Sequence, residues 1–112
     1  MYKSILVDWS AMSAELVLKA VAEPRRQAML RLLKAGASMT STDLGRRLDI
    51  TQQAASLHLK TLEDAGLVEA RRIGVRLLYS IKPEGFAPVE AFLREFWGEH
   101  LAALKHEIEG DG

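Results

Sequence analysis

The sequence contains no cysteine. A chain without thiols cannot form a disulfide framework, a thiolate zinc site or a thiol redox switch. Long apolar runs are missing too, since the run Ile5, Leu6 and Val7 is far shorter than the roughly 20 residues that a membrane helix requires. The same run is too short for the core of a signal peptide. These absences predict a cytoplasmic protein with no membrane partner.

The sequence also lacks the signals of an enzyme. No Ser, His and Asp stand in a recognisable catalytic setting. The glycines stand at predicted helix ends and in a predicted hairpin, and none belongs to a loop that would cradle a phosphate. We therefore predict no catalytic residue and no cofactor.

Net charge is zero over the 112 residues, which at first argues against a nucleic-acid partner. The distribution reverses that argument. Residues 19–82 hold 12 Lys and Arg against 6 Asp and Glu, a balance of +6, whereas residues 83–112 hold 2 against 7, a balance of −5. A basic excess confined to one part of a small single domain is typical of a nucleic-acid-binding surface, with random scatter of surface charge as the alternative.

Residues 51–68, TQQAASLHLKTLEDAGLV, have the pattern of one helix with a signal at each end. Thr51 can cap the free amides of the first turn. Gly66 can take the left-handed position after the last turn, with Leu67 as the apolar contact that often follows. A short helix over residues 42–48 precedes it, beginning at a capping box formed by Thr40 and Asp43. The pair predicts a helix-turn-helix whose second helix reads DNA.

The two sides of the predicted reading helix differ in chemistry. Ala55, Leu59 and Leu62 fall on one narrow arc, which predicts the buried side. An arc roughly opposite carries only amides, a hydroxyl and one amine, from Gln52, Gln53, Ser56 and Lys60. Amides and hydroxyls both donate and accept hydrogen bonds, as contact with base edges requires.

Residues 67–73 and 76–81 have the alternating pattern of two strands, joined through Gly74 and Val75. Gly74 supplies the positive φ that a tight hairpin needs. Arg71, Arg72 and Arg76 gather around the tip. Directly after a reading helix, a basic hairpin is typical of a wing that contacts the phosphate backbone or the minor groove, whereas alone it would equally well be a solvated hairpin.

Three segments together resemble the ArsR/SmtB winged-helix transcription regulators: AEPRRQAML (22–30), LGRRLDITQQAASLHLKTLEDAGLV (44–68) and RRIGVRLLY (71–79). The resemblance covers residues 19–82 well and the last helix loosely. It implies a fold that is mainly α with a small β-hairpin wing, a homodimer formed by the first and last helices, and repression of transcription.

For contact with double-stranded DNA we predict three groups of residues. Base edges are read by Gln52, Gln53 and Ser56, phosphates are bound by Thr51 and Lys60, and the wing contributes Arg71, Arg72 and Arg76. Leu57 departs from the resembled family, which usually has a polar or basic residue there. It falls at the edge of the reading arc, where it could meet a thymine methyl or pack against its neighbours. His58 falls near the buried side, which favours a packed, hydrogen-bonded histidine over a base contact.

The first and last helices are predicted to carry the dimer interface. A helix opens at Ser13, and a long helix begins between Phe86 and Pro88 and ends near Glu109. Its aromatic residues widen the apolar stripe beyond what one small domain covers, so a second chain is expected there. Residues 1–11 carry Trp9 among aliphatic residues and should pack on the body or on that second chain. The predicted interface residues are Trp9, Leu16, Val89, Phe92, Leu93, Phe96, Trp97 and Leu101.

The metal sites that the resemblance implies are missing their ligands. Where the family has cysteines before the reading helix, this chain has Thr40 and Thr42. Where it has Asp, His, His and Glu around the last helix, the aligned residues are Pro83, Gly85, Phe96 and Glu99. His106 and Glu109 could hold zinc across a dimer, but a solvated acidic face explains them as well. We predict no bound metal, and the effector stays unassigned.

The sequence thus predicts a single winged helix-turn-helix domain. Residues 1–22 would form an N-terminal arm and dimerisation helix, residues 23–82 the DNA-binding core, and residues 83–112 the C-terminal dimerisation helix. The predicted function is sequence-specific regulation of transcription at a palindromic operator. The alternative is a winged helix that binds proteins and not DNA. Exposed apolar residues on the reading helix would favour that alternative, and only Leu57 is of this kind.

Overall fold

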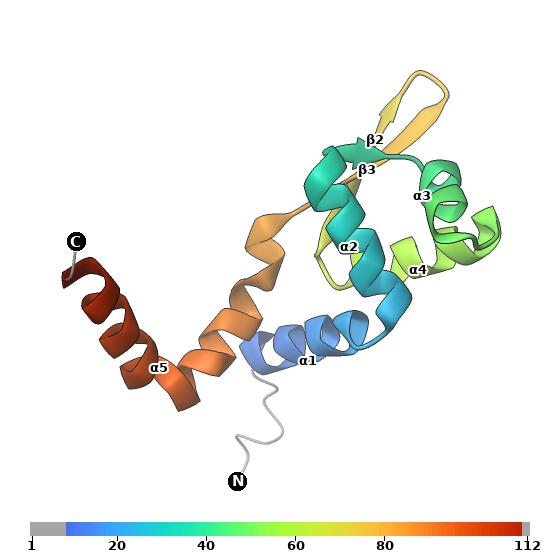
Figure 1. Cartoon of the computed structure of the whole chain (residues 1–112). Helices are drawn as coiled ribbons and strands as arrows, with labels where there is room; N and C mark the ends of the chain where they lie inside the picture. The colour runs from blue at the N-terminus through green and yellow to red at the C-terminus, as the bar shows by residue number, and fades with distance from the viewer. Residues whose placement is uncertain (1–8, 111–112) are drawn as a thin grey trace, which may run out of the picture.

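The computed structural model of the protein describes residues 9–110, without the side chains of residues 9–11, 101, 102, 105, 109 and 110. The predicted packing of residues 1–11 therefore lies outside the described residues, apart from the backbone from Trp9 onward. The elements follow one another as α1 (Trp9–Val21), α2 (Pro24–Gly36), β1 (Ser38–Met39), α3 (Ser41–Leu48), α4 (Gln52–Asp64), β2 (Val68–Ile73), β3 (Arg76–Ile81), the 3-10 helix η2 (Pro83–Phe86) and α5 (Ala87–Gly110). The β2–β3 hairpin projects on the side of α3 and α4, and α5 runs off on the opposite side (Figure 1).

The helix-turn-helix forms where the local signals predicted it. The Thr40 hydroxyl accepts from the backbone amide of Asp43, and the Asp43 carboxylate accepts from the amide of Thr40, which completes the capping box of α3. Asp49 ends α3 in the left-handed region, with φ of 57°. Thr51 then caps α4 by accepting from the amide of Ala54. Short-range hydrogen bonds therefore set both ends of the turn between the helices.

The end of α4 lies against η2, the element before α5, where two glycines meet. Gly66 has φ of 80°, and the amide of Leu67 donates to the carbonyl of Leu62, which closes the helix in a Schellman motif. Gly85 lies so close to this motif that a Cβ added to it would stand 1.9 Å from the Gly66 carbonyl oxygen. Sequence analysis did not predict this contact, because the two positions are distant along the chain.

The sheet has three antiparallel strands in the order β1-β3-β2, not the two that were predicted. The missed strand pairs Ser38 with Ser80 and Met39 with Tyr79. Its two residues are too few to show an alternating pattern. The predicted hairpin is confirmed, with Ile73 opposite Arg76 and a two-residue turn between them.

The core lies where α1, α2, α3, α4 and the base of the hairpin meet. The residues predicted to form the buried side of α4 have no exposed surface. The largest fully buried side chains are Met29, Leu33, Leu44, Leu59, Leu62, Leu67, Val17 and Val68. Because these come from five elements, α4 is held in a defined orientation toward the wing. No helix in the described part of the chain is long and apolar enough to cross a membrane.

The last helix has the predicted bounds, but the first helix does not. Helix α5 begins at Ala87 and ends at Gly110, as predicted. Helix α1 begins at Trp9, so the prediction that Ser13 opens it was wrong. A serine within a helix carries the same local signal as a serine at its start, and no other residue distinguished the two positions.

Candidate nucleic-acid interface

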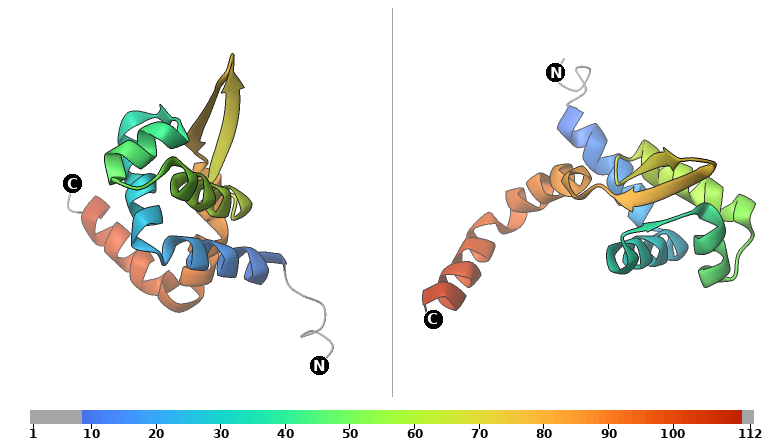
Figure 2. Two further views of the ribbon diagram at one scale, coloured as in Figure 1. Left: turned by 90° about the vertical axis from the view of Figure 1, so that its right-hand side faces the viewer. Right: turned by 90° about the horizontal axis from the view of Figure 1, so that it is seen from above.

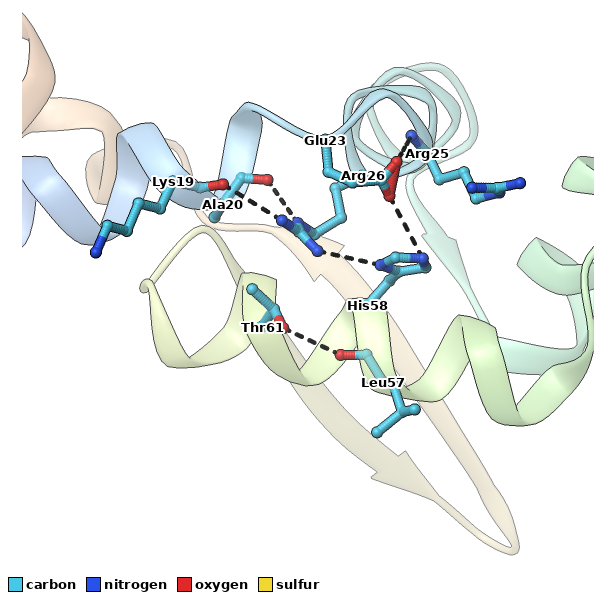
Figure 3. Close-up of polar contacts among 8 residues, drawn as sticks. All are labelled: Lys19, Ala20, Glu23, Arg25, Arg26, Leu57, His58 and Thr61. Carbon is cyan, nitrogen blue, oxygen red and sulfur yellow. Dashed lines mark hydrogen bonds and ion pairs between the residues drawn. The ribbon is translucent and has the colours of Figure 1, made fainter.

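The inner side of α4 is fastened to α1 and α2 through His58 (Figure 3). The Arg26 guanidinium stands 3.2 Å from His58 Nδ1 and donates to the backbone carbonyls of Ala20 at 2.6 Å and Lys19 at 3.3 Å. Glu23 caps α2 by accepting from the amide of Arg25, and its other carboxylate oxygen lies 3.4 Å from His58 Nε2. These contacts join the end of α1, the start of α2 and the middle of the reading helix.

The surroundings of His58 indicate its tautomer. A guanidinium can only donate, so the Nδ1 atom that faces Arg26 must accept, and the ring proton belongs on Nε2, toward Glu23. The contact between Nε2 and this Glu23 oxygen is close but is not a hydrogen bond. The oxygen is buried and has no hydrogen-bond partner among the described residues. The predicted hydrogen bond of His58 is confirmed, but the ring is half-buried and not part of the core as expected.

On the outer side of α4, Gln52 is oriented before any ligand arrives. Its amide nitrogen donates to Ser41 Oγ at 3.1 Å and to Ser56 Oγ at 3.2 Å. Both amide protons are thereby used, which leaves the Gln52 carbonyl oxygen and the two hydroxyl protons for a ligand. Sequence analysis missed Ser41, since only the packing of α3 against α4 brings it within reach. Gln53 is exposed one residue further along.

Thr51 and Lys60, the two residues predicted to bind phosphates, differ in the contacts that they already make within the chain. The Thr51 oxygen already accepts from the Ala54 amide at 3.0 Å, so its hydroxyl proton is what it can offer to a phosphate. Lys60 stands 3.6 Å from Asp64, and both side chains are well exposed. An exposed pair of this kind contributes at most about 1 kcal/mol, so Lys60 can exchange it for a phosphate at little cost.

A polar cavity of about 390 Å³ lies between α3, the start of α4 and the wing. It is lined by Thr40, Ser41, Thr42, Gln52, Ser56, Val75, Arg76, Leu77 and Tyr79. Arg76 is drawn toward it by Asp43, at 3.8 Å. Hydrogen bonds from Thr40 lower the pKa of the Asp43 carboxyl, with smaller contributions from the charges of Arg76 and Arg46. The capping box of α3 therefore also orients one arginine of the wing.

The three wing arginines do not share one face of the hairpin. Arg72 is opposite Leu77, which lines the cavity, and Arg71 is opposite Leu78. Because successive side chains of a strand point to opposite faces, Arg72 shares the face of Leu77, and Arg71 shares the other face with Arg76. All three arginines are exposed, as is Val75 at the tip. Of the three, Arg76 is the one that lines the cavity beside α3 and the start of α4.

Leu57 lies just past the edge of the arc of polar residues on α4 and almost opposite the buried side of the helix. At about 100° per residue it falls within about 15° of the direction opposite to the buried side. Its side chain is 68% exposed.

The residues predicted at a dimer interface divide into three groups. Leu16, Phe92, Phe96 and Trp97 are exposed, between 40% and 67%. Val89 packs against the core of its own chain and Leu93 is half-buried, so both are partly occupied by this chain. The side chains of Trp9 and Leu101 lie outside the described ones. Seen from above, α5 leads away from the helix-turn-helix (Figure 2).

The described residues hold no group of three or more His, Asp or Glu side chains that could bind a metal ion. His100 and His106 both stand on α5. The side chain of Glu109, which was considered as a partner of His106, is outside the described ones.

Comparison with known proteins places this geometry among regulators. A family model for a helix-turn-helix domain matches residues 21–71. The chain is 33% identical over 88 residues to the HTH-type transcriptional regulator YgaV of Escherichia coli, covering 79% of this chain and 89% of YgaV. It is 33% identical over 96 residues to the "Probable mercury resistance operon repressor" of Streptomyces lividans, covering 84% of this chain and 76% of that protein.

A solved structure shows the same arrangement of elements. It is the homodimeric winged helix-turn-helix DNA-binding domain of Mb0332 from Mycobacterium bovis, described as a possible ArsR-family transcriptional regulator. The TM-score is 0.65 at 33% identity, over 89% of this chain and 88% of that one.

Proposed function

This chain is a DNA-binding transcriptional regulator of the ArsR family of winged helix-turn-helix proteins, and we propose that it is a repressor that binds a two-fold symmetric operator as a homodimer. The observation that carries the proposal is the outer side of α4. It presents Gln53 and the oriented Gln52–Ser56 pair beside the exposed Arg72 and Arg76 of the wing. The amide of Gln53 suits adenine, the Gln52 carbonyl oxygen can accept from a base edge, and arginines suit phosphates.

The charge distribution supports DNA as the partner of this surface. The balance of +6 over residues 19–82 covers α2 to β3, and the balance of −5 falls on the rest of the chain after them. DNA would therefore be attracted to the reading helix and the wing and repelled from α5. A protein-binding surface in the same place would be expected to expose several apolar side chains, and α4 exposes Leu57.

Support for the homodimer comes from the opposite side of the molecule. Phe96 and Trp97 are large, exposed and next to each other on α5, and Phe92 packs edge-on against Phe96 at 5.2 Å between ring centroids. A homodimer with two-fold symmetry would cover them with the same residues of a second copy. Its two reading helices would then meet two half-sites related by the same symmetry. Repression is proposed because the relative from Streptomyces lividans is named a repressor.

Selection of duplexes from a random pool tests the proposal. We expect one enriched sequence with two-fold symmetry and half-sites about 10–10.5 base pairs apart, centre to centre. A promoter that carries this sequence should produce less transcript in vitro when the protein is added. Enrichment of a single asymmetric site would contradict the dimeric arrangement, a rise in transcript would contradict repression, and no enrichment at all would leave protein binding as the function of this surface.

A further inference from the structure

We propose that Leu57 reads the 5-methyl group of one thymine in each half-site of the operator. The inference rests on the proposed DNA-binding function and names the chemical feature that one residue of the reading helix recognises. Leu57 is then a residue that determines specificity. The sequence alone allowed either a base contact or internal packing at this position.

The position of Leu57 excludes internal packing as its main role. At 68% exposure it touches little of its own chain, and it belongs neither to the buried core nor to the apolar residues packed against it. Its neighbour His58 is directed toward Arg26 and Glu23, while the Leu57 side chain points away from them (Figure 3). Leu57 therefore faces whatever meets the outer side of α4.

The surroundings of Leu57 leave an apolar spot within a polar surface. Thr61 stands one turn further along, and its hydroxyl donates back to the Leu57 carbonyl at 3.3 Å, not outward (Figure 3). Gln53 stands one turn earlier and is exposed. A ligand that covers this face must offer polar groups to Gln53 and an apolar group to Leu57.

Double-stranded DNA offers one apolar group of this kind. In the major groove, A·T and G·C pairs present donors and acceptors, and the thymine C5-methyl is the only apolar feature. Gln53 favours adenine by the same code. Four residues of helix rise by about 6 Å, and stacked base pairs are about 3.4 Å apart. The thymine should therefore lie within about two base pairs of the adenine that Gln53 contacts.

Replacement of thymine by uracil tests the contact, because it removes the methyl and keeps every hydrogen-bonding group. Each thymine of the selected duplex is replaced in turn by deoxyuridine, and the affinities of wild type, Leu57→Ala and Leu57→Met are measured. For wild type we expect a loss of roughly fourfold at one thymine per half-site, the equivalent of about 0.8 kcal/mol for one buried methyl. Substitution in both half-sites should lower the affinity by roughly 15-fold.

The variants decide whether Leu57 is responsible. Leu57→Ala should bind the thymine and uracil duplexes at that position equally well, while Leu57→Met should keep most of the discrimination. Gln53→Ala is the matched control on the same face, and it should keep the uracil effect while losing affinity for both duplexes. The inference is overturned if no thymine shows a uracil effect, or if the effect persists in Leu57→Ala. If the proteins bind DNA but show no uracil effect, only the inference about Leu57 fails and the proposed function stands. If the wild type does not bind DNA, the inference and the proposed function both fail.

Discussion

Helix α4 packs one side on the body of the chain, whereas α5 is half-buried only in its first half, and their exposed surfaces differ in chemistry. Helix α4 exposes two amides, the Thr61 hydroxyl, charged side chains near its end and one large apolar residue, Leu57. Helix α5 exposes Phe96, Trp97, Leu104 and Ile108. Exposure alone therefore does not identify a partner. The polar side suits a ligand with donors and acceptors, and the apolar side suits a surface that is itself apolar.

The two helices also differ in the charge of the segments around them. Helix α4 lies between segments rich in arginine, while six of the seven acidic residues after Lys82 precede or belong to α5. Like charges keep α5 from the phosphate backbone, and the basic wing draws the backbone toward α4. These differences support the proposal that DNA meets α4 and that a second copy of the chain meets α5.

The largest effect is expected from a change on α5. Phe96→Glu combined with Trp97→Glu should produce monomers, because two carboxylates would lose their hydration in the interface. DNA affinity should fall roughly 100-fold or more, since two half-sites are then no longer bound together. Sedimentation and titration of the selected duplex provide the measurements. Glu95→Lys, exposed on the other side of α5, is the control and should stay dimeric. Wild type that sediments as a monomer at micromolar concentration would refute the assignment.

A change on α4 should alter reading without altering assembly. Gln53→Ala should weaken binding to the selected duplex by about 1–3 kcal/mol and leave binding to a scrambled duplex almost unchanged, because a base contact is lost and no phosphate contact. Titration of the two duplexes at one salt concentration measures the difference. An equal loss on both duplexes would show that Gln53 contacts the backbone.

The wing should contribute to affinity through phosphate contacts, without reading the sequence. Arg72→Ala should weaken binding to both duplexes alike and lower the salt dependence by about one unit per subunit, since one phosphate contact fewer releases fewer counterions. Arg76→Ala is the comparison, because Arg76 is already paired with Asp43 and its loss also affects α3. Titrations at several salt concentrations give the slopes. A loss confined to the selected duplex would mean that Arg72 reads bases.

The smallest effect is expected at the capping box behind the reading surface. Asp43→Asn should lower the free energy of unfolding at neutral pH by about 0.5–1 kcal/mol, because a carboxylate at the start of α3 is lost. The pKa of Asp43 is lowered in the folded protein, so its contribution is complete above the unfolded pKa and disappears as pH falls through the folded pKa. Denaturant unfolding of both proteins at neutral and acidic pH tests this, with Glu69→Gln, at an exposed position of β2, as the control for removal of a surface charge. A difference that persists in strong acid would contradict it.

Local signals were sufficient for much of the fold. The caps at Thr40, Thr51 and Gly66 and the turn at Gly74 each depend on residues within a few positions, and all four were predicted and observed. The sequence also specified the two sides of α4, because helical periodicity is set by the backbone and needs no distant partner. The same reasoning failed at Ser13, where the signal of a helix start occurs inside a helix.

Contacts between distant segments were decided by the tertiary structure alone. The sequence holds no periodic or local signal that Ser41 orients Gln52, that Asp43 draws in Arg76, or that Gly85 fits against Gly66. Nor could it show how much of the Leu57 side chain stays exposed, since that depends on the elements that pack around α4. Local hydrogen bonds and periodicity act over a few residues, whereas the orientation of each side chain at the interface depends on how whole helices pack against one another.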